Sequence, residues 1–187
     1  LYNVIKYMES WECYEEMITR LAAPASDFVK PDHFSRKQVR SMGRVALMAT
    51  DASERALKDA QLLDNQEITE GRMGVGYGSS TGSTDAVADF GNMILNHSSR
   101  HLNANTYLKM MSHTAAVNVG VFFGLKGRVI PTSSACTSGS QGIGFSYETI
   151  KYGHQDMMVA GGAEELCPTE AAVFDTLFAT STRNHEP

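Results

Sequence analysis

The sequence has few cysteines, no long apolar run and no concentration of positive charge. The three cysteines, Cys13, Cys136 and Cys167, are odd in number and far apart, so they predict neither a disulfide framework nor a metal site. No apolar stretch approaches the roughly 18 residues that a membrane helix needs. Because 21 acidic residues outnumber 16 lysines and arginines and no basic cluster occurs, we expect no nucleic-acid partner and no membrane insertion.

The N-terminal residues also lack the basic start and apolar stretch of a signal peptide, and widely spaced cysteines are typical of a reducing compartment. We therefore expect the protein to be cytoplasmic. A hydrophobic fraction of 42% and a charged fraction of 20% are ordinary for a globular protein with a core. The length of 187 residues and the absence of repeats or linkers favour a single domain.

Apolar periodicity predicts two long helices. Small and apolar residues recur every three or four positions over residues 35–63 and again over 107–123. Ser35 is placed to cap the first helix, and Asn105 or Thr106 to cap the second. The other helices expected are shorter and cover residues 7–21, part of 85–95, 138–152 and 169–176.

Three short apolar runs between these helices predict strands over residues 72–80, 128–133 and 156–162. Unbroken apolar strands that alternate with helices are typical of a parallel sheet covered by helices, so we predict an α/β fold. The first of these strands contains Gly74, Gly76 and Gly78. Their spacing does not match a dinucleotide-binding motif, so we expect them to allow close backbone packing.

Cys136 lies where the second strand gives way to a helix, within the glycine- and serine-rich segment Pro131–Gly144. The positive end of a helix dipole favours a thiolate, which is the nucleophilic form of cysteine. Small neighbours let a substrate carbonyl approach closely, so the segment suits an enzyme that holds its substrate as a thioester. A buried structural cysteine is about equally compatible with the local sequence alone.

Six histidines offer alternatives to this chemistry. His97 and His101 are four residues apart, but no third ligand is placed beside them, so we expect a solvated surface pair rather than a metal site. His113 is expected to be a satisfied histidine of the core. No histidine is placed by sequence beside Cys136, which disfavours a cysteine hydrolase of another fold. Neither a metal nor another cofactor is predicted.

Three segments in order resemble the elongating β-ketoacyl-acyl-carrier-protein synthases. The segments are Ser134–Gly139 around Cys136, Met158–Glu164, and Ser181–Asn184, and the resemblance runs from about residue 28 to residue 184. It implies a thiolase-like fold of two similar halves, each with a sheet sandwiched between helices. Residues 1–187 resemble the N-terminal half only, without its opening strand. The other half of such enzymes supplies two histidines and a lysine, and no residue of this chain takes those positions.

The resemblance also implies roles for two residues of this chain. Cys136 takes the place of the acyl-accepting nucleophile, and its backbone N–H would be one donor of the oxyanion hole. Phe174, ten residues before Asn184, takes a place that lines the acyl pocket. The family dimerises along the sheet that carries residues 128–133, so a homodimer or heterodimer is expected. The residues around Met110 and Met111 would reach the partner's pocket.

The expected activity is that of a 3-oxoacyl-acyl-carrier-protein synthase in fatty-acid or polyketide synthesis. The acyl group passes from a carrier protein to Cys136, and decarboxylative condensation with malonyl-carrier protein follows. Because the family's histidines have no counterpart in residues 1–187, we expect these residues alone to accept an acyl group without condensing it. The alternative is a truncated or non-catalytic partner subunit, although such subunits usually lack the cysteine.

Overall fold

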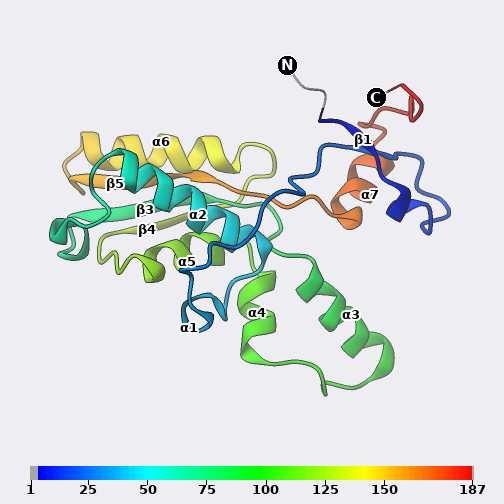
Figure 1. The fold of residues 1–187 in the computed structure, drawn as a ribbon, viewed down its shortest axis with the longest axis horizontal. Helices are drawn as coiled ribbons and strands as arrows, with labels where there is room; N and C mark the ends of the chain where they lie inside the picture. Colours follow the sequence, from blue (N-terminus) through cyan, green and yellow to red (C-terminus); the bar gives the residue numbers. More distant parts are fainter. Residues whose placement is uncertain (1–3, 187) are drawn as a thin grey trace. The chain divides into compact units, whose positions relative to one another are not determined.

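A computed structural model describes residues 4–186 of the chain. Backbone contacts divide the chain into two compact units, one formed by residues 30–165 and the other by 1–29 together with 166–187. Figure 1 shows the elements of each unit along the chain. Within the described residues, no helix is both long and apolar enough to cross a bilayer.

A parallel three-stranded sheet forms the centre of the larger unit. Strands β3 (Met73–Gly78), β4 (Val129–Thr132) and β5 (Met157–Gly162) lie in the order β4-β3-β5, and all run in the same direction. Every residue of the central strand β3 is buried, and Val75 pairs with a valine on both neighbouring strands. The three predicted strands and their parallel arrangement are therefore confirmed.

Helices cover both faces of this sheet. Helix α6 (Ser138–Lys151) packs against one face, whereas α5 (Thr114–Phe122) and α2 (Arg44–Asp59) lie on the other (Figure 1). The buried core lies between the sheet and the helices α2 and α5, and it includes Val45, Ala49, Met73, Val75, Ala116 and Val119. The predicted sheet between helices is confirmed.

Glycines allow α6 to approach the sheet at backbone distance. A Cβ atom on Gly142 would lie 2.9 Å from the carbonyl oxygens of Gly161 and Gly76, and one on Gly78 would collide with the Ser138 backbone. The prediction that Gly74, Gly76 and Gly78 serve close packing is therefore confirmed. This contact fixes the first turns of α6 against the carboxyl ends of β3 and β5.

The helix predicted over residues 35–63 is interrupted. Ser35 does cap a helix, because its side chain accepts from the Gln38 N–H in a capping box, but this helix, α1 (Arg36–Val39), ends after one turn. Helix α2 begins after Gly43, whose missing Cβ leaves the space that the Ser83 side chain occupies. A tertiary contact thus decides a break that the periodicity of the sequence does not reveal.

The helix predicted over residues 107–123 is likewise two helices, α4 (Ala104–Met110) and α5. The cap of α4 is Asn103, whose side chain accepts from the Asn105 and Thr106 N–H groups, so the predicted cap at Asn105 or Thr106 was wrong. The turns expected around residues 85–95 form the full helix α3 (Asp85–Asn96), which packs against α4 (Figure 1). A short 3₁₀ helix, η2 (Gln66–Thr69), precedes β3.

The smaller unit contains the antiparallel strands β1 (Lys6–Tyr7) and β2 (Leu21–Ala22), the 3₁₀ helix η1 (Glu9–Trp11) and the helix α7 (Pro168–Thr176). Helix α7 confirms the prediction over 169–176, but the helix predicted over 7–21 was wrong. The Asp175 carboxylate accepts from the backbone N–H groups of Ile18 and Thr19, at 2.7 and 3.0 Å. These N–H groups are therefore satisfied without a helix, and the chain instead turns back to pair β2 with β1.

These hydrogen bonds predict an acid-sensitive contact in the smaller unit. The N–H groups of Ile18 and Thr19 stabilise the carboxylate and lower the pKa of Asp175, the bond from Ile18 having the larger effect. A lowered folded-state pKa gives stability that is present above the ordinary value of 3.8 and is lost as the pH falls further. We expect the amides of Ile18 and Thr19 to lose hydrogen-exchange protection at least about tenfold on acidification.

The matching variant is Asp175→Asn, in which the side chain at position 175 no longer titrates. Its protection at Ile18 and Thr19 should be low and should depend little on pH once intrinsic exchange rates are corrected. Hydrogen exchange followed by mass spectrometry measures both proteins. The same acid-induced loss in Asp175→Asn as in the unmodified chain would contradict the assignment.

Candidate active site around Cys136

Cys136 lies in a short connection between β4 and α6, which we call the elbow (residues 133–137). It directly precedes Thr137, the N-cap residue of α6, and is solvent-exposed. Within residues 4–186 its thiol has no hydrogen-bond partner. The thiol is therefore free to meet a ligand, and its position depends on the backbone of the elbow.

The elbow backbone turns through an uncommon conformation that side chains from α6 hold. Ala135 has φ 52°, in the left-handed region that residues other than glycine adopt rarely. The hydroxyl of Ser138 accepts from the Ser134 N–H at 2.8 Å and donates to the Ala135 carbonyl oxygen at 2.7 Å. Strained backbone of this kind persists only where surrounding contacts over-determine it, and it is often found at active sites.

Two further hydroxyl groups connect the elbow to its surroundings. Thr132, the last residue of β4, donates to the Ser138 carbonyl oxygen at 2.7 Å, and Thr137 donates to the Ser134 carbonyl oxygen at 2.8 Å. The first bond fixes the start of α6 to the end of the strand. The second closes the turn around Cys136. Both keep the cysteine in front of the helix N-terminus, the positive end of the helix dipole.

A second loop lies against the elbow and is held by two neighbouring glutamates. Glu164, after β5, accepts from the Ser79 hydroxyl at 3.2 Å and from the Ser80 N–H at 2.5 Å. The Ser133 hydroxyl in turn donates to the Ser80 carbonyl oxygen at 3.3 Å. The next residue, Glu165, is buried and accepts from the backbone and hydroxyl of Thr84. The two glutamates after β5 therefore hold the loop that follows β3.

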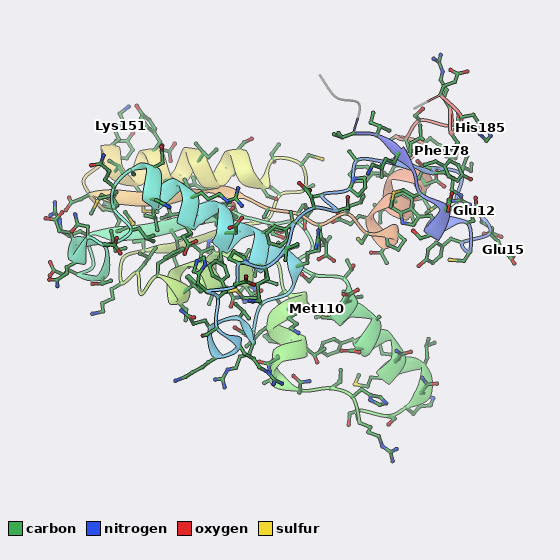
Figure 2. All side chains as sticks on the ribbon, in the orientation of Figure 1. Glu12, Glu15, Met110, Lys151, Phe178 and His185 are labelled. Carbon is green, nitrogen blue, oxygen red and sulfur yellow. The ribbon has the colours of Figure 1, made fainter. Side chains whose placement is uncertain are left out.

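Phe174, the second predicted site residue, lies in α7 and belongs to the smaller unit, whereas Cys136 belongs to the larger one. Its side chain is 42% exposed. Phe178 follows α7 with φ 53° and is 89% exposed (Figure 2). The role of Phe174 in an acyl pocket stays a prediction.

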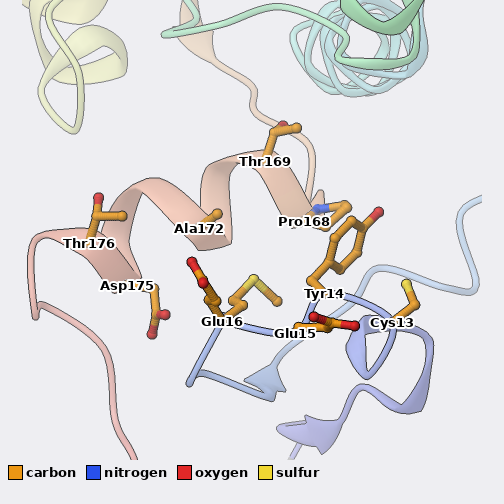
Figure 3. A pocket seen from close by; sticks show the side chains of 10 residues that line it. Cys13, Tyr14, Glu15, Glu16, Pro168, Thr169, Ala172, Asp175 and Thr176 are labelled. Atoms are coloured by element: carbon orange, nitrogen blue, oxygen red, sulfur yellow. The ribbon is translucent and has the colours of Figure 1, made fainter.

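The smaller unit also contains a hollow of about 620 Å³ between α7 and residues 13–17 (Figure 3). Tyr14, Met17, Pro168 and Ala172 give it apolar walls, and Glu15 and Glu16 add carboxylates. Phe174 does not line this hollow. The hollow therefore does not test the predicted role of Phe174.

The histidines are placed at the surface. His97 and His101 are exposed, as expected for a solvated pair, but His113 is also exposed, so its prediction as a core histidine was wrong. His113 is the N-cap residue of α5, which places it at the end of the helix and not on its buried side. Across residues 4–186, no three side chains of histidine, cysteine, aspartate or glutamate converge to hold a metal ion.

Sequence reasoning identified Cys136 but missed the groups that hold it. The hydroxyl groups of Thr132, Thr137 and Ser138 make the bonds described above, and their concentration around one cysteine was the available signal. The contribution of Glu164 and Glu165 had no local signal, because their partners are more than 80 residues away.

Comparisons with known proteins identify the family of this chain. Residues 14–187 match the family model described as the N-terminal domain of β-ketoacyl synthase. The 3-oxoacyl-[acyl-carrier-protein] synthase 2 of Vibrio harveyi is 34% identical over 173 residues, which cover 90% of this chain and 41% of that protein. Nodulation protein E of Rhizobium meliloti is 34% identical over 135 residues, covering 72% of this chain and 33% of the relative.

Solved structures give the same result for the fold. The crystal structure of a β-ketoacyl synthase from Burkholderia phymatum superimposes with a TM-score of 0.96 and 53% identity, covering 99% of this chain and 45% of that one. The ishigamide ketosynthase/chain length factor shares the fold at 18% identity, with a TM-score of 0.79. The chain thus spans less than half the length of these relatives. It belongs to the β-ketoacyl synthase family and has the thiolase-like fold of its N-terminal domain.

Proposed function

We propose that this chain forms the acyl-accepting part of a 3-oxoacyl-acyl-carrier-protein synthase, with Cys136 as the nucleophile. The observation that carries the proposal is the exposed, unbonded thiol on a strained elbow directly before α6. The relatives named as 3-oxoacyl-[acyl-carrier-protein] synthase 2 support the same reaction class.

In the first step the Cys136 thiolate attacks the carbonyl carbon of an acyl thioester on the carrier protein. The new carbon–sulfur bond forms as the bond to the carrier's sulfur breaks, and the carrier leaves as a thiolate that takes a proton from water. One thioester replaces another, so the reaction needs no further reactant. The Cys136 backbone N–H would stabilise the negative oxygen of the tetrahedral intermediate.

In the second step a malonyl thioester on the carrier protein loses carbon dioxide, and the resulting enolate carbon attacks the acyl-Cys136 carbonyl. Cys136 leaves as a thiolate, and the product is a 3-oxoacyl thioester two carbons longer. The forming enolate requires hydrogen-bond donors, which family members provide with histidines outside the region this chain matches. We therefore expect residues 1–187 alone to complete the first step and not the second.

An apolar face of α6 supports the need for a further layer in the working enzyme. Ile143 and Tyr147 lie one turn apart and are 57% and 62% exposed, and Ile150 follows on the same face. Contiguous exposed apolar side chains of this kind mark an interaction surface. The relatives are more than twice as long as their match to this chain, so we infer that a second sheet-and-helix half covers this face.

The proposed partners are the acyl carrier protein, with acyl and malonyl thioesters, and a second synthase subunit. The dimer contact is expected along β4, an edge strand in the described sheet whose Val129 is exposed. The residues around Met110 and Met111 would lie near the partner's pocket. A reducing cytoplasm would keep the thiol of Cys136 available. A non-catalytic partner subunit is the weaker alternative, because Cys136 and its supporting hydroxyl groups are all present.

The test is intact-mass analysis of the folded chain after incubation with an acyl-acyl-carrier-protein thioester, followed by proteolysis to locate the adduct. We expect one added acyl group, on the peptide that contains Cys136. If circular dichroism shows that the chain is folded and no adduct forms, the proposal that these residues suffice for acyl transfer is rejected. Formation of a 3-oxoacyl product from this chain alone would contradict the expectation about the second step.

A further inference from the structure

We infer that Gln141 is a positioning residue for Cys136, acting through Ser134. The benefit of this positioning rests on the proposed function, in which Cys136 is the nucleophile, whereas the contacts themselves do not. Gln141 lies on the first full turn of α6, where its backbone N–H donates to the Thr137 carbonyl oxygen at 2.9 Å. Its side-chain Oε1 accepts from the Ser134 hydroxyl at 2.7 Å. The Gln141 amide therefore bonds to Ser134, which lies two positions before Cys136 in the sequence.

This bond completes a set of side-chain contacts to Ser134, two positions before Cys136. The hydroxyl of Thr137, the N-cap residue of α6, donates to the Ser134 carbonyl oxygen. The hydroxyl of Ser138, the first residue of α6, accepts from the Ser134 N–H. Gln141 accepts from the hydroxyl of Ser134, and this hydroxyl also accepts from the Thr137 hydroxyl at 3.0 Å. All three polar groups of Ser134 are thus held by one helix, and the chain between Ser134 and that helix carries the cysteine.

These contacts matter because the elbow backbone has an unfavourable conformation and would relax without them. Ala135 is held in the left-handed region, which is unfavourable for a residue with a Cβ atom. Cys136 itself contributes no side-chain bond within residues 4–186 that would resist such a change. Loosening Ser134 would therefore let the thiol move relative to the N-terminus of α6 and away from the position in which it meets an electrophile.

These contacts to Ser134 also explain why glutamine suits position 141. Its side chain is long enough to reach over one turn, and it is neutral, so it accepts a hydrogen bond without adding a negative charge beside a thiolate. Gln141 and Ser134 are solvent-accessible, so their bond does not serve to fill the core. Its expected effect is on the orientation of Cys136 more than on global stability.

The experiment measures alkylation of Cys136 by iodoacetamide as a function of pH, in a Cys13→Ala background so that no other exposed thiol reacts. Cys167 is buried. Gln141→Met keeps the length of the side chain and removes the amide oxygen, whereas Ser134→Ala removes the donor. We expect either change to slow alkylation at neutral pH by about threefold to tenfold. The double variant should show no larger effect than either single one.

Ser140→Ala is the matched control, because Ser140 lies on the same turn and is exposed, and its hydroxyl has no hydrogen bond within the described residues. Its profile should equal that of the Cys13→Ala background. A wild-type profile for Gln141→Met, or additive effects in the double variant, would overturn the inference. Alkylation needs no carrier protein, so a chain that forms no acyl adduct but shows this coupling would reject the proposed function and leave the positioning role intact.

Discussion

Cys136→Ala is expected to abolish the acyl adduct formed from an acyl-acyl-carrier-protein thioester, a loss of at least about a hundredfold relative to the unmodified chain. The three cysteines differ in ways that make this expectation specific. Cys136 is exposed, unbonded and placed before a helix of 14 residues. Cys13 is also exposed, but it follows a three-residue 3₁₀ helix and its thiol donates to the Ser10 carbonyl oxygen.

Cys167 provides the more demanding comparison, since it too begins a helix. It is the N-cap residue of α7, and its sulfur accepts from the Glu170 N–H and contacts the Thr169 hydroxyl. It is buried, however, so a carrier-bound thioester cannot reach it. A helix N-terminus without exposure is therefore insufficient, and so is exposure without a helix.

The control for this prediction is Cys13→Ala, which should form the adduct at a rate within about twofold of the unmodified chain, as expected of a surface change away from the site. Cys136→Ser should behave like Cys136→Ala, because a serine hydroxyl is not ionised near neutral pH and is a far weaker nucleophile. Intact-mass time courses compare all four proteins. A normal adduct on Cys136→Ala, or its loss in Cys13→Ala, would move the nucleophile to another residue.

Local sequence predicted the parts of the fold that local sequence decides. Strands β3, β4 and β5 are short apolar runs between turn residues, and Gly153 ends α6 with φ 70°, so each carries its own signal. The segment over residues 7–21 carries a helical period and still forms no long helix. The N–H groups of Thr19 and Ile18 instead donate to Asp175, which lies 156 and 157 positions away along the chain. Such a partner cannot be read from a window of 15 residues.

The same division holds at the candidate site. A cysteine between a strand and a glycine-rich helix was visible in the sequence, and so were the hydroxyl residues around it. The direction of each hydrogen bond was not, because it depends on the left-handed backbone of Ala135 and on how closely α6 meets β3. Glu164 is the clearest example, since its bond to the Ser80 N–H exists only when β5 lies beside β3.

Gly142→Ala is expected to destabilise the larger unit by about 1–3 kcal/mol, the usual cost of overpacking a tight contact. The new Cβ would lie 2.9 Å from two carbonyl oxygens, those of Gly76 in β3 and Gly161 in β5. Neither oxygen can yield without moving its strand, because the two strands are paired along their whole length. Helix α6 would therefore have to shift away from the sheet. The shift would displace the elbow that begins the same helix, so the acyl adduct on Cys136 should also form more slowly.

Gly144→Ala is the matched control, two residues further along α6, where a Cβ would meet no atom within 4 Å. In a helix interior this change should stabilise the protein by about 0.5–1 kcal/mol, since alanine loses less backbone freedom on folding than glycine. Denaturant unfolding followed by circular dichroism gives both free energies of unfolding, and the adduct assay gives both rates. Equal stability of the two variants would show that α6 does not depend on backbone contact with the sheet. A destabilised Gly142→Ala with an unchanged adduct rate would show that Cys136 is positioned by the bonds of the elbow alone.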